Sequence, residues 1–545
     1  MEKRSSFLSG VLVILLSQLA VKVVGLVYRL VITNIPGFGD VGNGFYTAGF
    51  QLYMLLLSLS SVGIPSAIAK LVSAQVALGN REEAHRIFRT ALGLFFVIGL
   101  GCSAILFFGA DPIARYVIQM DGVQWTLQAL APSITLVCLS SVIRGYFLGL
   151  GDVKATGRSQ VLEQVVKSVL TILFVLGLTA YSAQVMSAGA NFATTVATGV
   201  SVLYLAVYYR RRRPAMAGLP WQRDRERVLG LCRTILRVSI PISLGSIVIA
   251  IGRVIDTGTI TRGIAAAFAG GIPGQEGIPT AEQLNQEAVR LAGMLSKSDT
   301  ILNLPLALNI ALATVLVPTL SAALASGKRQ EAEEKAAFSL RLSVLLIFPC
   351  AGGLIALAQP IYHLLYPNAP DGYQLLAIGA VALVFMALEQ TINGSLQGLG
   401  QIFVPARALL WGVGVKVVLN TLLIRIPAIN IYGASIGSLC CYGTACTICF
   451  VHLRKTLYMD LPVGNFIGKP LFCTVVMGVG AWAGYGLLLR ATGSDGLSLL
   501  VTILGAVVLY GALVLALGIL SPKDWAQMPL PAPLRRRLCP EEASE

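Results

Sequence analysis

The chain has 545 residues, of which 55% are hydrophobic and 12% charged, and its mean hydropathy is +0.76. These values exclude an ordinary soluble globular protein and indicate a helical protein that crosses the membrane many times. A net charge of +15 would suggest nucleic-acid binding in a soluble protein, but here the excess lies mainly in loops on one side of the membrane. We therefore expect no nucleic-acid partner.

Apolar runs of the length that crosses a bilayer recur along the whole chain. The first run, 7–32, is too long for the apolar core of a signal peptide and has no cleavage pattern, so we expect it to remain in the mature protein. We predict an all-α integral membrane protein with about fourteen transmembrane segments, near 7–32, 46–76, 87–109, 126–150, 160–181, 187–209, 235–260, 291–322, 338–357, 374–398, 408–426, 431–452, 467–489 and 497–520.

Lysine and arginine fall on alternate connections, which is how the orientation of membrane helices is encoded. The connection at 33–45, by contrast, has no basic residue at all. The basic connections contain Lys3 and Arg4, Arg81 to Arg89, Lys154 and Arg158, Arg210 to Arg233, Lys328 to Lys335, Arg407, Arg454 to Lys469, and Lys523 to Arg537. This pattern predicts a multi-pass protein of the cell membrane with both termini in the cytoplasm.

One stretch occurs twice in the chain. Residues 143–151 read IRGYFLGLG and residues 392–400 read INGSLQGLG, a register of 249 residues that also places Lys167 on Lys416. Each copy ends an apolar segment with Gly-x-x-x-Gly, crosses a short polar turn and opens another apolar segment with a lysine inside it. We interpret the chain as two homologous halves with a binding site between them.

Six segments in each half give both halves the same orientation, so the repeat is a parallel one with a pseudo-two-fold axis along the membrane normal. We expect two six-helix bundles followed by two additional transmembrane helices, with the longest outer loop at 262–290. The ranges are 1–209 for the N-terminal bundle, 210–234 for a basic cytoplasmic linker, 235–455 for the C-terminal bundle, 456–522 for the two additional helices and 523–545 for a cytoplasmic tail.

The sequence gives no sign of catalysis. It has no P-loop and no His-Glu-x-x-His motif, and its three histidines are widely scattered, so we expect neither an enzyme nor a cofactor. Cys441, Cys446 and Cys449 match the opening spacing of a ferredoxin-type cluster, but they lie in a membrane segment without a convincing fourth ligand. Helix packing explains them better, and no metal site is expected.

Ionisable residues inside apolar runs carry the functional signal, because they are costly in the bilayer unless they line a cavity or form a pair. Lys22 and Arg29 share one helical face of the first segment, and Lys22 lies too deep to reach the interface. We expect Lys22 in a polar cavity, whereas for Arg29 a cavity position and an interfacial one both stay open. Arg253 and Asp256 form either a self-neutralising pair or a cavity cation held in place by the aspartate.

Other ionisable residues have competing structural explanations. Lys70 and Arg144 lie near the cytoplasmic face, where both can anchor a helix at the interface. Lys167 has Glu163 one turn before it, which favours a structural salt bridge. Lys416, its repeat counterpart, has a glycine at that position and is the better candidate for a functional lysine.

Cations outnumber acids in this set, which also includes Lys297, Asp299 and Glu389. A cationic cavity without a nucleotide-binding motif suggests an anionic, membrane-borne substrate such as a phosphate-linked lipid. A cation or drug antiporter would be expected to carry carboxylates at its centre. The predicted substrate-binding residues are Lys22, Arg29, Lys70, Lys167, Arg253, Asp256, Lys297 and Lys416.

In their order, KVVGLVYR at 22–29, GIPSAIAKL at 63–71 and the Leu-Pro to Val-Pro stretch at 304–318 resemble a known family, as does the glycine repeat. The family is the lipid-linked oligosaccharide flippases of the MOP (multidrug/oligosaccharidyl-lipid/polysaccharide) superfamily, in the branch of the lipid II flippases and the stage V sporulation protein B group. The resemblance covers essentially the whole chain. Against the better-known Gram-negative members, Tyr28 and Thr300 stand in place of arginines and Arg29 in place of an acid.

The resemblance implies two bundles that alternate between inward-open and outward-open states around a cationic cavity for the pyrophosphate and sugar. It also implies a groove beside the last two helices for the lipid tail, and it gives Lys22 the place of a basic cavity residue. We predict a flippase for lipid II or a sporulation-related precursor, monomeric, in contact with membrane lipids, and driven by the membrane potential or a coupling ion. The alternatives are a flippase for another lipid-linked polysaccharide unit, a cation-coupled multidrug exporter of the same fold, and a non-transporting scaffold.

Overall fold

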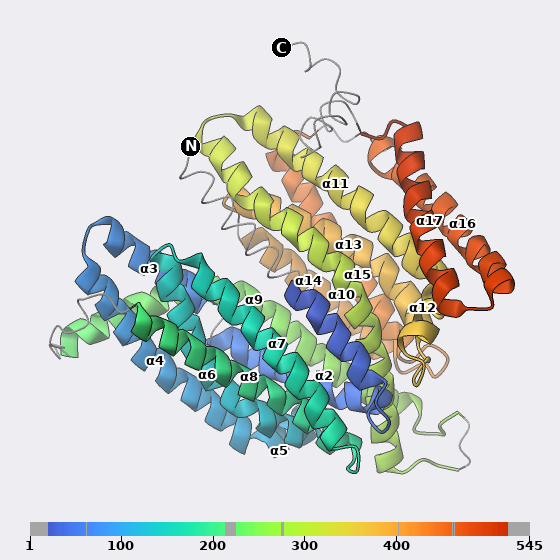
Figure 1. Ribbon diagram of the computed structural model, residues 1–545, viewed down its shortest axis with the longest axis horizontal. Helices are drawn as coiled ribbons and strands as arrows, with labels where there is room; N and C mark the ends of the chain where they lie inside the picture. Colours follow the sequence, from blue (N-terminus) through green and yellow to red (C-terminus); the bar gives the residue numbers. More distant parts are fainter. Residues whose placement is uncertain are drawn as a thin grey trace. The chain divides into compact units, whose positions relative to one another are not determined.

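The structure, a computed structural model, describes residues 20–60, 63–212, 225–273, 277–401, 403–459, 462 and 464–520. Every regular element in these ranges is helical (Figure 1). Ten of the described helices are long and apolar enough to cross a membrane, and one shorter apolar helix accompanies them. The expected all-α membrane fold is confirmed, and the count of fourteen segments stays a prediction. The start of the first predicted segment, residues 213–224 of the linker and the C-terminal tail lie outside the described residues.

The described part of the first segment is a helix over 20–33, and long helices joined by short connections follow it. Up to residue 267 they are α2 (Gly39–Ser60), α3 (Ile64–Ala77), α4 (Arg81–Phe108), α5 (Ala110–Pro112), the π-helix η1 (Ile113–Ile118), α6 (Val123–Gly149), α7 (Val153–Gly177), α8 (Ala183–Arg211) and α9 (Arg225–Ala267). After it come α10 (Ala281–Ala325), α11 (Arg329–Ala356), α12 (Ala358–Leu365), α13 (Tyr373–Gly398), α14 (Phe403–Leu423), α15 (Tyr432–Thr456), η3 (Gly464–Gly468), α16 (Lys469–Thr492) and α17 (Asp495–Ala516).

The structure corrects the sequence prediction at two places. The predicted single segment 46–76 is two helices, α2 and α3, and Pro65 lies in the first turn of α3. Proline is favoured there and cannot extend a preceding helix, because it has no amide hydrogen. The loop expected at 262–290 is also shorter, because α9 continues to residue 267 and α10 begins at residue 281. Hydropathy detects only the apolar part of a helix, whereas these helices continue with polar residues.

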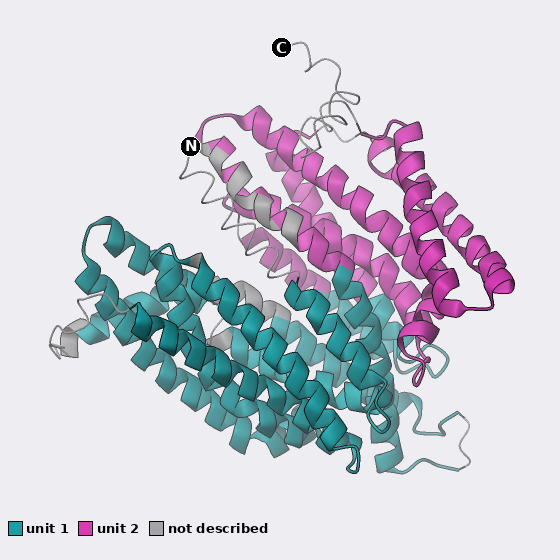
Figure 2. Ribbon diagram, viewed as in Figure 1, with its two compact units in different colours: residues 1–304, 413–437 teal, residues 305–412, 438–545 magenta. Residues whose placement is uncertain are grey.

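The chain divides into two compact units (Figure 2). Unit 1 comprises residues 1–304 and 413–437, and unit 2 comprises residues 305–412 and 438–545. The predicted bundle boundaries at 1–209 and 235–455 stay a prediction.

In unit 1, α6 lies at the centre and packs against α2, α3, α4 and α8. Its inner face buries Leu127, Ile134 and Tyr146, and the Tyr146 ring lies 4.4 Å from the ring of Phe88 on α4. In unit 2, α11 packs against α13 and α16, and α16 packs against α17. Inside a bilayer such contacts stabilise mainly by close van der Waals packing, because lipid is as apolar as the side chains.

The cysteines that match a cluster spacing lie on α15. Cys446 and Cys449 belong to the apolar core of unit 2, together with Leu396 and Leu453. Within the described part of the chain, no three His, Cys, Asp or Glu side chains gather in a way that could hold a metal ion. These contacts are those of packing residues.

The repeated stretch forms the same helix end in both units. After α6 the amide of Asp152 donates to the carbonyl five residues earlier at 2.9 Å, and after α13 the amide of Gln401 does the same at 2.9 Å. The residue before each is a glycine in the left-handed region, Gly151 with φ +82° and Gly400 with φ +79°. This is the Schellman helix end, which glycine adopts without steric cost.

The repeat also fixes a close helix crossing in each unit. A Cβ atom on Gly145 would lie 2.8 Å from the Pro65 carbonyl oxygen on α3. A Cβ atom on Gly394 would lie 2.8 Å from the Ala313 carbonyl oxygen on α10. Only glycine allows the two backbones to approach so closely. The repeat seen in the sequence therefore encodes one helix end and one crossing, built twice.

Candidate anion-binding site

Seven charged side chains on five helices of unit 1 form one electrostatically linked group. Lys22 and Arg253 are within range of each other's charge, and Asp299 is within range of Arg253 and Lys416. Arg29 and Lys167 flank the same tyrosines, Tyr28 and Tyr46. We call this group the charged cluster, and its members are Lys22, Arg29, Lys167, Arg253, Asp256, Asp299 and Lys416. Five cations and two carboxylates leave it net positive.

Two predicted site residues lie apart from the charged cluster. Lys70 is exposed on α3 and makes no ion pair among the described residues. Lys297 on α10 is only 1% exposed and lies 2.7 Å from a carboxylate oxygen of Asp40 on α2. Gly293 on α10 meets the Asp40 backbone so closely that a side chain could not fit between the helices. Lys297 is thus neutralised inside a tight helix crossing.

Lys416 on α14 holds the one aspartate of α9 that was expected to pair within its own helix. Its Nζ atom lies 2.7 Å from Asp256, and the amide of Asn420, one turn later, donates to the other carboxylate oxygen at 2.6 Å. The interpretation of Arg253 and Asp256 as partners is therefore wrong. Asp256 pairs across helices because residues three apart share a helix face only approximately, whereas α14 brings an ammonium directly to the carboxylate.

Arg29 lies inside unit 1 and does not extend to an interface. Its guanidinium donates to the hydroxyls of Ser296 at 2.7 Å and Thr47 at 3.2 Å, and these two hydroxyls are 2.6 Å apart. The same guanidinium lies 4.5 Å from the centre of the Tyr46 ring, a cation–π distance. All of these partners are neutral, so Arg29 keeps its full positive charge.

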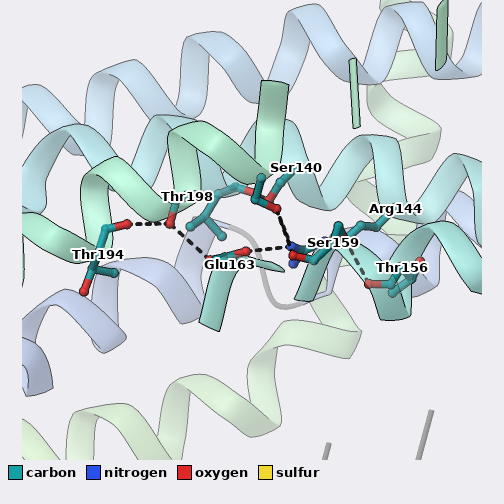
Figure 3. Close-up of polar contacts among 9 residues, drawn as sticks. Ser140, Arg144, Thr156, Ser159, Glu163, Thr194 and Thr198 are labelled. Atoms are coloured by element: carbon teal, nitrogen blue, oxygen red, sulfur yellow. Dashed lines mark hydrogen bonds and ion pairs between the residues drawn. The ribbon is translucent and has the colours of Figure 1, made fainter. Parts of the chain in front are cut away.

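Lys167 on α7 does not form the salt bridge with Glu163 that the sequence favoured. Its Nζ atom lies 4.9 Å from the centre of the Phe50 ring and 6.0 Å from that of Tyr28. Glu163 instead accepts from Arg144 on α6 at 2.6 Å (Figure 3). Arg144 is therefore a partly buried ion-pair partner, and the expected role as an interfacial anchor is wrong.

Lys22 and Arg253 are the most accessible cations of the charged cluster. Both side chains are exposed in the structure, and neither forms an ion pair among the described residues. Asp299 on α10 is also exposed and faces this group. Ammonium and guanidinium groups without carboxylate partners can donate several charge-assisted hydrogen bonds to phosphate oxygens.

Sequence reasoning missed several residues that shape the site. Thr47, Ser296 and Asn420 supply hydrogen bonds, and Asp40 and Glu163 each neutralise a cation that was predicted to act elsewhere. One signal was available for Asn420, which lies one turn after Lys416 and so on the same helix face. Asp40 had no such signal, because it lies in a stretch that was predicted as an outer connection.

Unit 2 carries a separate apolar groove of about 540 Å³ between α11, α13 and α16. Its walls are almost entirely hydrocarbon, and they include Phe348 and Ile355 on α11, Val381 on α13, and Val475 and Trp482 on α16. Such a surface suits an extended apolar chain and offers little to a polar group.

Solved structures with the same fold are membrane transporters. The lipid II flippase MurJ in an inward closed conformation superposes with a TM-score of 0.68, covering 91% of this chain and 97% of that one at 15% identity. A multidrug resistance MATE family transporter of the MOP superfamily, in an inward-facing conformation, superposes with a TM-score of 0.64, covering 81% and 98% at 14% identity. The chain thus has the fold of these multi-pass helical membrane proteins.

The family is given by the sequence models. The model of the polysaccharide biosynthesis proteins matches residues 7–324, and the model of the lipid II flippase MurJ matches residues 287–503. Since the first match covers more than half of the chain, the protein belongs to the polysaccharide biosynthesis protein family. The resemblance inferred from the sequence motifs is confirmed.

Relatives of similar length occur in Bacillus subtilis (strain 168). The chain is 26% identical over 484 residues to the membrane protein YabM, covering 87% of this chain and 86% of the relative. It is 25% identical over 423 residues to stage V sporulation protein B, covering 74% and 78%. It is 23% identical over 446 residues to the lipid II flippase MurJ, covering 77% and 78%.

Proposed function

We infer that the protein is a flippase that moves a polyprenyl-pyrophosphate-linked cell-wall precursor, lipid II or a sporulation-related equivalent, across the cell membrane by alternating access. The observation that carries this inference is the net positive charged cluster on the membrane helices of a member of this family. A lysine or arginine at the centre of a membrane helix costs about 2.5–3.5 kcal/mol in insertion, so cations without carboxylate partners there indicate an anionic ligand.

Lys22, Arg253 and Lys167 are the proposed contacts for the pyrophosphate, since none of them is neutralised by a described carboxylate. Hydrogen bonds to the hydroxyls of Thr47 and Ser296 hold the Arg29 guanidinium in place, and its charge adds positive potential to the site. Lys416 forms an ion pair with Asp256, so it can bind phosphate only in competition with that carboxylate.

The apolar groove of unit 2 is the proposed binding surface for the polyprenyl tail. Its volume of about 540 Å³ and its hydrocarbon walls match a chain of carbon atoms without polar groups. We further propose that both termini lie in the cytoplasm, that the protein acts as a monomer, and that the membrane potential or a coupling ion drives transport. The loop-charge pattern supports the orientation.

The alternatives differ in the ligand that the site would bind. A cation-coupled multidrug exporter shares the fold, but in the charged cluster only Asp256 and Asp299 are acidic, and Asp256 is already bound by Lys416. A flippase for another lipid-linked polysaccharide unit would use the same cations and differ in the sugar contacts. A scaffold would gain nothing from keeping charges inside the membrane.

Native mass spectrometry of the purified protein in detergent tests the proposal, with lipid II as ligand and undecaprenyl phosphate and a cationic dye as comparisons. We expect selective lipid II binding and a loss of roughly tenfold or more in affinity for Lys22→Ala, because a charge-assisted hydrogen bond contributes about 1.5–3 kcal/mol. Lys154→Ala, which removes an exposed lysine of α7 outside the charged cluster, is the matched control. Lys70→Ala in the same series decides whether that lysine contributes to lipid II binding.

Each outcome of this experiment is informative. Preference for the dye would favour the exporter, and equal binding of every polyprenyl-linked lipid would favour the wider flippase class. Unchanged lipid II affinity in both Lys22→Ala and Lys416→Ala would remove the charged cluster as the substrate site.

A further inference from the structure

Arg144 and Glu163 form a closed polar network inside unit 1, on α6 and α7 (Figure 3). One Arg144 nitrogen, Nη2, donates to Glu163 Oε2 at 2.6 Å and to the Ser201 hydroxyl of α8 at 2.9 Å, and Nε donates to the Ser159 hydroxyl at 3.0 Å. The other carboxylate oxygen, Oε1, lies 3.1 Å from the Thr198 hydroxyl. Both oxygens of Glu163 are therefore occupied by partners from neighbouring helices.

Lys167 lies one helical turn after Glu163 on the same helix face. Residues four apart on a helix bring their side chains within ion-pair reach, and a glutamate before a lysine is the favourable order. Both charges interact electrostatically with the Tyr53 hydroxyl, so Glu163 and Lys167 lie close to the same tyrosine. Yet Lys167 lies over the Phe50 and Tyr28 rings and forms no ion pair among the described residues.

The choice of partner follows from the chemistry of the two cations. The planar guanidinium of Arg144 engages a carboxylate and two hydroxyls at once, and it is less strongly hydrated than an ammonium. A lysine is a single point of charge, and aromatic ring faces can hold it with about 0.5–2 kcal/mol. Glu163 therefore pairs with Arg144, and Lys167 has no carboxylate partner among the described residues.

The second half of the chain supports this reading of the pair. In the repeat register Arg144 corresponds to Asn393 and Glu163 to Gly412, so the arginine and the glutamate are both absent there. The lysine of that half, Lys416, is neutralised by Asp256 of another helix. The two repeat lysines thus differ in charge balance, and the half that keeps its lysine unpaired is the half that contains Arg144.

We propose that Arg144 is a positioning residue that holds Glu163 away from Lys167, so that Lys167 remains an unpaired cation for the phosphate of a lipid-linked substrate. This inference rests on the proposed function, in which Lys167 contacts that phosphate. Arg144 itself touches no substrate. Its removal releases Glu163 to pair with Lys167, and the site then loses the unpaired positive charge of Lys167.

The test is a double-mutant cycle read by native mass spectrometry of the full chain in detergent, with lipid II as the probe. Lys167→Gln measures the contribution of the lysine, and we expect it to weaken binding roughly tenfold, the effect of losing one charge-assisted hydrogen bond. Arg144→Gln should weaken binding by a similar factor. Arg144→Gln/Glu163→Gln should restore affinity to within about twofold of the unsubstituted protein, because no carboxylate then competes for Lys167.

Arg158→Gln is the matched control, because it removes an exposed arginine of α7, the helix that carries Glu163 and Lys167, and should leave binding unchanged. Arg144→Gln leaves Glu163 partly buried without its cation and can impair folding. Arg144→Lys then takes its place: it keeps a cation beside Glu163 but cannot engage Glu163, Ser159 and Ser201 together. Glu163 is then shared with Lys167, and we expect an affinity between those of the unsubstituted protein and Lys167→Gln.

The possible failures are separable. If Lys167→Gln binds the probe normally, Lys167 is not a phosphate contact and that part of the proposed function is wrong. If Lys167→Gln is weak but Arg144→Gln is normal, Arg144 does not position Glu163. If Arg144→Gln is weak and the double substitution stays equally weak, Arg144 has only a structural role.

Discussion

The ammonium of Lys416 lies 2.7 Å from the carboxylate of Asp256, although the two residues are 160 positions apart in the chain. Both side chains are less than one-fifth exposed, and Asn420 binds the second carboxylate oxygen at 2.6 Å. The pair joins α14 to α9. Each charge depends on the other, because a single charge left in a poorly solvated site is strongly unfavourable.

Replacing one partner of this pair should therefore destabilise the protein more than replacing both. We expect Lys416→Met to cost about 2 kcal/mol, below the 3–5 kcal/mol found for fully buried pairs because the site is partly open. Lys416→Met/Asp256→Asn should recover most of that loss. Thermal unfolding in detergent measures both, and a double variant as unstable as the single one would show that the pair is not energetically coupled.

Lys22→Ala should abolish lipid transport without changing thermal stability. The side chain is exposed and forms no ion pair among the described residues, so its removal disturbs no packing. The expectation is checked by reconstituting the variant in liposomes and following lipid II translocation, with Lys154→Ala as the control. Normal translocation by Lys22→Ala would place the substrate elsewhere.

Lys297→Ala should be the most destabilising single lysine substitution in unit 1. It would leave Asp40 with an uncompensated charge in a crossing where Lys297 is 1% exposed and Asp40 10% exposed, and such losses are about 3–5 kcal/mol. Lys328→Ala is the matched control, because Lys328 pairs with Glu331 at 3.5 Å while 67% exposed. Exposed pairs of this kind contribute little, so its unfolding temperature should stay unchanged.

Gly145→Ala should destabilise the protein by about 1–3 kcal/mol, because the new methyl group would lie 2.8 Å from the Pro65 carbonyl oxygen and force α3 and α6 apart. Gly101→Ala makes the same change in α4 where nothing lies within 4 Å of the added atom. That variant should be neutral or slightly more stable, since alanine favours helix over glycine. Equal unfolding temperatures for the two variants would contradict the close crossing.

The apolar groove predicts a dependence on lipid chain length. Val475→Trp should fill the groove and lower the affinity for undecaprenyl phosphate while leaving that for a short-chain prenyl phosphate unchanged. Val501→Trp places the same ring on the exposed face of α17, away from the groove lining, and should preserve the preference for the long chain. Native mass spectrometry with both lipids provides the comparison. Loss of both affinities in Val475→Trp would indicate a folding defect.

Local physics made the fold predictable from the sequence. Long apolar runs specify membrane helices because backbone polar groups must be satisfied inside the bilayer. The repeated glycines specify one helix end and one crossing, and Gly151 and Gly400 adopt the same left-handed conformation because no side chain opposes it. The sequence by itself therefore determined the helical class, the repeat and the presence of unusual cations inside the membrane segments.

Only the tertiary structure decided which charge meets which. Helical spacing offered Lys167 as the partner of Glu163, and Arg253 as that of Asp256, but Arg144 and Lys416 hold those acids instead. An ion pair four residues apart is worth only a few tenths of a kcal/mol, so a better-placed cation from another helix displaces it. Partner choice depends on how helices distant in sequence cross, and no local pattern records that geometry.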